Sequence, residues 1–187
     1  MGVKKIFQTL EDRNNPDEVE SQGPFICTNN PWLGKGYYFW DTFLDLAHWW
    51  GKQVHSGNYI ICQTFIEDNS EYILDLVGNT QHLIEFKEYA DVLKQTYNTK
   101  GPITVPFIIE HMKKMTDFHY KAIRANPINS TSGDEYFNSQ KLRFIKKDPA
   151  YLELIPPIQI CVINKEILGK NRFRIIYPET YCEGYTI

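Results

Sequence analysis

The pattern of apolar and polar positions predicts strands toward both ends of the chain and helices in its middle. Alternating or continuous apolar runs, which are typical of strands, occupy residues 4–10, 34–40, 58–67 and 71–76, and again 141–145, 157–163 and 172–177. This order of elements predicts an α+β fold with a mostly antiparallel sheet and flanking helices. The length of 187 residues suits a single domain spanning 1–187.

Helical spacing and end signals predict four helices. They cover residues 14–23, 41–51, 83–97 and 105–115. Thr42 and Asp45 have the spacing of a capping box at the start of the second of these helices. The polar, turn-rich segment 126–140 is predicted to be a loop.

Composition and charge exclude some classes of protein. The net charge of −3 does not fit a general nucleic-acid-binding surface, although residues 101–187 carry 12 basic and 9 acidic side chains. The basic run from Lys141 to Lys147 is typical of a solvated strand edge, and contact with an anionic target is the alternative. No signal peptide and no apolar run long enough for a membrane span occur, so we expect a cytoplasmic protein.

Common catalytic and metal motifs are absent from the sequence. The four cysteines form no CxxC pair, and Cys62 and Cys161 lie in apolar runs that predict buried thiols. HExxH, GxGxxG, the Walker lysine motif and GxSxG do not occur, which argues against a zinc hydrolase, a Rossmann-type NAD site and a serine hydrolase. We predict no metal site.

The aromatic segment 34–50 is the most distinctive part of the chain. In a strand, Tyr38 and Trp40 share one face, and the glycines before them allow close approach to the backbone. A tyrosine on this strand and Trp49 on the next helix would form a slot for a flat ring, with His48 beside it. The alternative is that all these rings pack in the core.

This segment, LGKGYYFWDTFLDLAHWW, resembles the diphtheria-toxin-like ADP-ribosyltransferases, which include the poly-ADP-ribose polymerases. In that family a glycine-lysine-glycine turn precedes a tyrosine that stacks on the nicotinamide of NAD, and a ring on the next helix stacks on its other side. The resemblance implies an ADP-ribosyltransferase-like split antiparallel sheet. It also implies that Gly36, Tyr38, His48 and Trp49 bind NAD.

The family's other two motifs are altered in this sequence. The histidine that ends the family's first strand corresponds to Gln8 or Thr9, whose backbone would hold the nicotinamide amide. The glutamate that begins a late strand corresponds to Gln159, and Glu153 is the nearest acid if the alignment is shifted. A glutamate stabilises the positive charge that develops on the ribose, whereas glutamine brings a hydrogen bond without charge.

The resemblance therefore implies an enzyme that transfers single ADP-ribose units from NAD to a macromolecule, with Tyr38 and Gln159 as the catalytic residues. The acceptor, protein or nucleic acid, stays open, as does a toxin-type role with an antitoxin partner. An NAD glycohydrolase and a non-catalytic NAD or ADP-ribose-binding domain are the alternatives.

Overall fold

The computed structural model of the chain describes residues 2–68, 71–97, 102–115, 117–127, 134–147, 149–169 and 173–182. It contains one seven-stranded sheet and one two-stranded hairpin. No helix within these ranges is both long and apolar enough to cross a membrane. The predicted α+β class with a mostly antiparallel sheet is confirmed.

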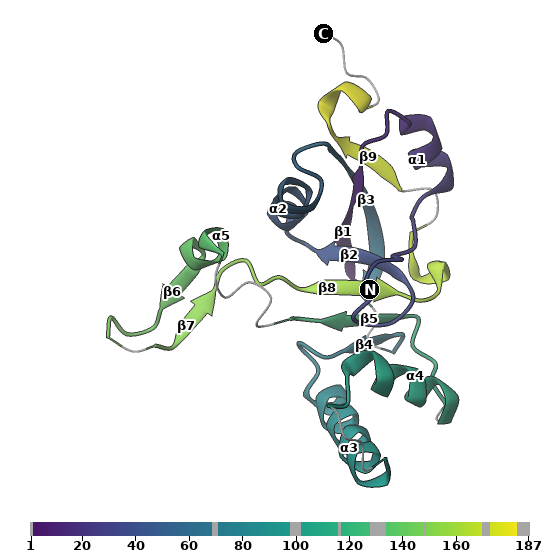
Figure 1. The fold of residues 1–187 in the computed structure, drawn as a ribbon, viewed down its shortest axis with the longest axis vertical. Coiled ribbons are helices and arrows are strands. Elements are labelled where there is room, and N and C mark those ends of the chain that lie inside the picture. The colour runs from purple at the N-terminus through teal and green to yellow at the C-terminus, as the bar shows by residue number, and fades with distance from the viewer. Residues whose placement is uncertain are drawn as a thin grey trace.

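The large sheet has the strand order β4-β5-β8-β2-β1-β3-β9 and is antiparallel except for the β4–β5 pair (Figure 1). Its strands are β1 (Gly2–Glu11), β2 (Tyr37–Asp41), β3 (Tyr59–Asp68), β4 (Ile73–Asp75), β5 (Ala122–Ala125), β8 (Gln159–Val162) and β9 (Arg174–Tyr177). The first and third strands pair along their whole length, from Gly2–Asp68 to Glu11–Tyr59. This long antiparallel pair is the frame on which the shorter strands assemble.

Helices lie at both ends of the sheet. The α-helices are α1 (Pro16–Gln22), α2 (Leu44–Val54), α3 (Thr80–Thr96), α4 (Val105–Met115) and α5 (Glu135–Ser139), and two 3-10 helices, η1 (Lys165–Ile167) and η2 (Glu179–Tyr181), follow β8 and β9. Helix α2 packs against β1, whereas α3 and α4 lie near the β4 edge. A small hairpin of β6 (Lys141–Arg143) and β7 (Tyr151–Glu153) projects from the body together with α5 (Figure 1).

The two faces of the sheet carry separate apolar clusters. Ile6, Phe39 and Ile160 are fully buried in one cluster, and Ile123 and Cys161 in another. Neighbouring residues of β2 and β8 fall in different clusters because side chains alternate along a strand. Both faces are therefore covered, which explains why these strands read as almost continuous apolar runs.

Three local predictions are corrected by the structure. Residues 122–125 form a strand between β4 and β8 that the sequence pattern did not reveal, and residues 135–139 of the predicted loop form α5. Residues 128–133 of that loop lie outside the described part of the chain. Thr42 does not cap α2: its φ is +64°, and its hydroxyl donates to the Asp41 carboxylate at 2.7 Å.

Candidate functional site

A cavity of about 210 Å³ lies where β1 and β2 diverge. Their ladder joins only Ile6 to Asp41 and Phe7 to Trp40. The cavity is lined by Gln8, Thr9 and Leu10 of β1 and by Tyr38, Phe39 and Trp40 of β2. Trp50, Gln159 and residues of the loop 25–32 complete its wall. The expected cleft between two small sheets is thus a gap within one continuous sheet.

Gln8 fastens the loop after α1 to the sheet. Its Nε2 donates to the carbonyl oxygens of Phe25 and Tyr38, at 2.8 and 3.3 Å, and its Oε1 accepts from the Phe25 amide at 2.9 Å. Only 5% of Gln8 is exposed. The side chain therefore bridges β1 and β2 where their backbone ladder has ended, and both ends of its amide are already used.

Thr9 connects the cavity to α2. Its hydroxyl donates to the Ala47 carbonyl at 2.9 Å, and the buried residues Leu46 and Ala47 face the sheet. Trp50 follows these two residues by four and three positions, so it lies on the same side of the helix and reaches the cavity.

The predicted pairing of Tyr38 with Trp49 around one slot is corrected to Tyr38 and Trp50. One residue along a helix turns the side chain by about 100°, and Trp49 accordingly points to α5. There its indole donates to Asp134 at 2.9 Å and its ring packs edge-on against Phe137 at 4.8 Å. Trp40 touches both tryptophans, with ring centroids 6.1 and 6.0 Å away.

Tyr38 lies in the cavity wall with its hydroxyl held by the turn before β2. The hydroxyl accepts from the Leu33 amide at 2.7 Å and donates to the Gly34 carbonyl at 2.9 Å. Burial raises the pKa of this hydroxyl, and the nearby Cys161 thiol adds to the effect. Tyr38 is therefore a neutral phenol whose polar end is occupied, which leaves its ring as the part that a ligand would contact.

Gln159 begins β8 and lies in the same wall. Its Oε1 accepts a hydrogen bond of 2.8 Å from the indole Nε1 of Trp32, a residue of the loop after α1. Glu153, the alternative acid, lies instead on β7 opposite Lys141 in the projecting hairpin. The structure thus brings Gln8, Thr9, Tyr38 and Gln159 to one cavity and leaves Glu153 outside it.

Gly36 does not line the cavity. A Cβ built on it would lie 2.4 Å from the Cys161 sulfur and 2.7 Å from the Val162 carbonyl oxygen. Its absent side chain therefore serves close packing of β2 against β8 rather than approach of a ligand, which corrects its predicted role. Gly34 is required for a different reason, since its φ is +91°.

His48 faces a second, more open depression of about 580 Å³ on the other side of α2. Its Nδ1 is 2.9 Å from the Tyr59 hydroxyl, and its ring meets Tyr177 edge-on at 4.9 Å. Burial lowers the pKa of His48, and the charge of Lys52 lowers it further. The predicted position of His48 beside the Tyr38 slot is therefore corrected.

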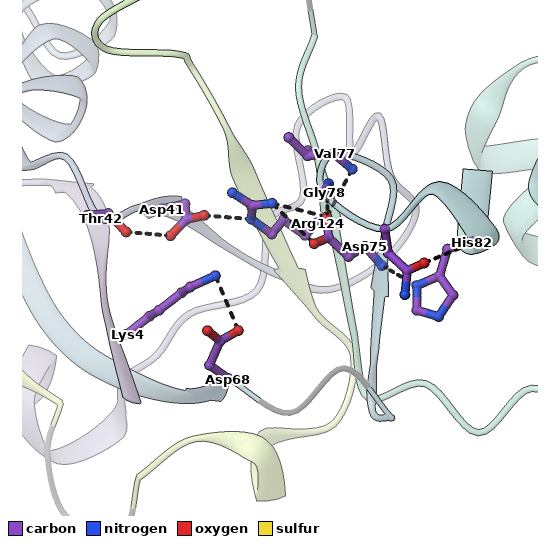
Figure 2. A network of polar contacts seen from close by, with 10 residues as sticks. Lys4, Asp41, Thr42, Asp68, Asp75, Val77, Gly78, His82 and Arg124 are labelled. Carbon is purple, nitrogen blue, oxygen red and sulfur yellow. Dashed lines mark hydrogen bonds and ion pairs between the residues drawn. The ribbon is translucent and has the colours of Figure 1, made fainter. Parts of the chain in front are cut away.

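A buried ion network joins Asp41 of β2 to Arg124 of β5 and Asp75 of β4 (Figure 2). Arg124 of β5 donates from Nε to Asp41 at 2.7 Å and from Nη1 to both oxygens of Asp75, at 3.1 and 3.2 Å. Burial alone would raise the pKa of Asp75, but the Gly78 and Val77 amides together with Arg124 lower it. This network fixes Asp41, from which the chain turns into the helix that carries Trp50.

Sequence reasoning missed the loop of residues 25–32, which forms one side of the cavity. Two residues in the sequence could have indicated this loop, because Pro24 and Asn30 are both typical of turns and loops rather than of helices or strands. Asn30 adopts a φ of +47°, a conformation that asparagine tolerates better than most residues. The backbone of this loop is tied to β2 through the Cys27 amide, which donates to the Gly36 carbonyl at 2.9 Å.

Comparison with known proteins adds one relative. An uncharacterized protein of Methanocaldococcus jannaschii is 24% identical over an alignment of 207 positions, which covers 94% of each chain. No protein-family model matches the chain, and no solved structure matches it. The relative extends over nearly the whole chain and has no described activity.

Proposed function

We propose that the chain binds NAD in the cavity between β1 and β2 and transfers its ADP-ribose, as single units, to a macromolecular acceptor. The observation that carries this proposal is the meeting of three separate segments in one cavity: Gln8 and Thr9, Tyr38, and Gln159. The resemblance assigns these segments to the three motifs of the diphtheria-toxin-like ADP-ribosyltransferases, of which the first and third are altered in this sequence. The β1–β2 ladder is short, which leaves room for this cavity within the sheet.

The size of the cavity supports a particular orientation of NAD. At about 210 Å³ it is smaller than the roughly 300–1,000 Å³ of sites that enclose a drug-sized ligand. It would therefore take the nicotinamide ring and its ribose and leave the adenosine end in the open. In this orientation the rings of Tyr38 and Trp50 would supply the aromatic contacts, and the backbone of Gln8 and Thr9 would hold the carboxamide, as the resemblance implies.

The reaction breaks the bond between ribose C1′ and the nicotinamide nitrogen. The electron pair of that bond leaves with neutral nicotinamide, and a nucleophilic atom of the acceptor bonds to C1′ and loses its proton. In the alternative glycohydrolase, water is the nucleophile and free ADP-ribose is the product. A non-catalytic NAD or ADP-ribose-binding domain is the second candidate, and the neutral Gln159 at the cavity favours it.

Labelled NAD distinguishes these functions. The purified chain is incubated with NAD labelled in the adenylate, with and without a cell lysate, and the products are treated separately with protease and with nuclease. Label on a macromolecule supports transfer, and the treatment that releases it identifies the acceptor class. Free ADP-ribose indicates hydrolysis, whereas calorimetric binding of NAD without nicotinamide release indicates the binding domain.

A purification together with neighbouring gene products would test the toxin-type role, since an antitoxin would be expected to cover the same cavity. A partner that abolishes NAD binding supports that role. NAD binding that is unchanged in the complex argues against it.

A further inference from the structure

The hydrogen bond between Trp32 and Gln159 fixes which end of the Gln159 amide faces a ligand. The two residues are 127 positions apart, and their side chains meet at 2.8 Å in the cavity wall. An indole nitrogen is only a donor, so the atom of Gln159 that faces Trp32 has to be the carbonyl oxygen Oε1. The orientation of the amide therefore follows from chemistry.

The amide nitrogen is the end of Gln159 that Trp32 does not contact. It has no hydrogen-bond partner among the described residues, and it is not one of the buried unpartnered side-chain atoms, which belong to Asn15, Asn126 and Tyr136. The nitrogen therefore has no bonding partner in the described part of the chain, and it belongs to a residue that lines the cavity. It carries two N–H donors and no acceptor.

We propose that Trp32 is a positioning residue that holds Gln159 with its amide nitrogen toward the ligand, so that this wall of the cavity presents a hydrogen-bond donor. The group that it meets is an acceptor oxygen, such as a ribose hydroxyl or ring oxygen. The identity of this ligand as NAD rests on the proposed function, whereas the orientation of Gln159 does not.

This orientation has a chemical consequence. When the C1′–nicotinamide bond breaks, positive charge develops on the ribose, and an N–H donor beside it gives no electrostatic stabilisation. The wild-type site therefore holds the dinucleotide and cleaves it slowly. In Gln159→Glu one carboxylate oxygen accepts the Trp32 N–H bond, and the other is free to accept from a ribose hydroxyl and to balance the charge.

The first arm of the test needs no ligand. Nitrogen-15 NMR spectra of the full chain are compared for wild type, Trp32→Phe and Trp49→Phe, with the side-chain amide of Gln159 assigned through a Gln159→Leu variant. We expect the Gln159 amide signals to shift or broaden in Trp32→Phe. They stay unchanged in Trp49→Phe, a matched control that loses an indole hydrogen bond to Asp134 outside the cavity. Unchanged Gln159 signals in Trp32→Phe overturn the inference.

The second arm measures NAD affinity by calorimetry and nicotinamide release by chromatography. We expect Gln159→Glu to raise the turnover number for hydrolysis by roughly tenfold or more, with a smaller change in affinity. The double variant Trp32→Phe, Gln159→Glu loses most of that gain. If Gln159→Glu raises the turnover number equally with and without Trp32→Phe, the positioning role of Trp32 is overturned. If no variant binds NAD, the proposed function fails, and the NMR arm still decides the orientation of Gln159.

Discussion

Gln8 and Phe25 are joined by two hydrogen bonds that link one side-chain amide to both the N–H and the carbonyl of one residue. A primary amide can do this because it carries a donor and an acceptor side by side. The bonds hold the loop of residues 25–32 against the end of the β1–β2 ladder. The Gln8 side chain thus has a structural task in this chain.

Gln8→Glu is predicted to destabilise the fold. The carboxylate still accepts from the Phe25 amide, but it cannot donate to the Phe25 carbonyl, and it places a charge at a site that is 5% exposed. We expect the free energy of unfolding in urea to fall by about 2–3 kcal/mol. The same substitution at the exposed Gln53 is the control and should change it by less than about 0.5 kcal/mol. Equal free energies of unfolding for wild type and Gln8→Glu would show that the Gln8 hydrogen bonds make no net contribution to stability.

Tyr38→Ala and Trp50→Ala are predicted to weaken NAD binding, each by roughly tenfold, because each removes one aromatic contact in the cavity. Trp49→Ala should instead lower the free energy of unfolding, by roughly 2–3 kcal/mol, since its ring packs against Phe137. Calorimetry and urea unfolding separate the two effects. An NAD affinity that depends on Trp49 and not on Trp50 would contradict the assignment of the cavity as the NAD site.

Much of the fold could be predicted because its long elements repeat clear patterns. The β1 and β3 strands and the α3 and α4 helices are found where apolar spacing indicates them. Strand β5 escaped prediction because it is four residues long and carries a charge, Arg124. That charge is tolerated only because Asp41 and Asp75 neutralise it, and these partners lie 83 and 49 positions away.

Side-chain positions in the candidate site that follow from local secondary structure could be predicted from the sequence. Contacts that form only through tertiary packing could not. The position of Tyr38 on β2 follows from strand alternation. Trp50 rather than Trp49 could have been chosen from its spacing to Leu46 and Ala47, which form the buried side of α2. The contact of Trp32 with Gln159 joins a loop to a late strand, and no local pattern records it.

Arg124→Met is predicted to be strongly destabilising. It keeps most of the side-chain volume but removes the cation between Asp41 and Asp75, and Asp41 is 3% exposed. We expect a loss of about 3–5 kcal/mol in urea unfolding at pH 7. Lys121→Met in the segment just before β5 is the control: its ion pair with Glu166 is exposed, so its loss should cost less than about 1 kcal/mol. Similar losses in both variants would argue against a special role for the buried network.

Acid is predicted to destabilise the protein through His48. Burial and then Lys52 lower its pKa in the folded state, so the unfolded chain takes up the proton first as the pH falls. The contribution of His48 to the free energy of unfolding is therefore complete above the unfolded-state pKa of about 6.5. It is lost as the pH drops through the lower pKa of the folded state. We expect His48→Gln to reduce the slope of unfolding free energy between pH 7.5 and 5.

His55 has a pKa that burial also lowers, so part of the slope should persist in His48→Gln. An NMR titration in which the His48 ring titrates at or above pH 6.5 would contradict the prediction.

The projecting hairpin has two chemically different faces. Lys141 and Arg143 share one face with Tyr151 and Glu153, and the Lys141 ammonium lies 4.9 Å from the centre of the Tyr151 ring. Leu142 and Leu152 pair on the other face, where they are 58% and 48% exposed. Cations interleaved with an aromatic ring suit an anionic polymer with stacking bases, so a nucleic-acid acceptor would approach the first face.

If the acceptor is a nucleic acid, replacing Lys141, Arg143, Lys146 and Lys147 with glutamine should reduce labelling and make it less sensitive to salt. The slope of log affinity against log salt concentration is negative, and each lost phosphate contact reduces its magnitude by about 0.7–0.9. Leu142→Ser with Leu152→Ser is the control, because it alters the opposite face and removes no charge. Gel-shift titrations at several salt concentrations measure both variants. A slope that is the same in wild type and in the glutamine variant would mean that the acceptor does not bind through this face.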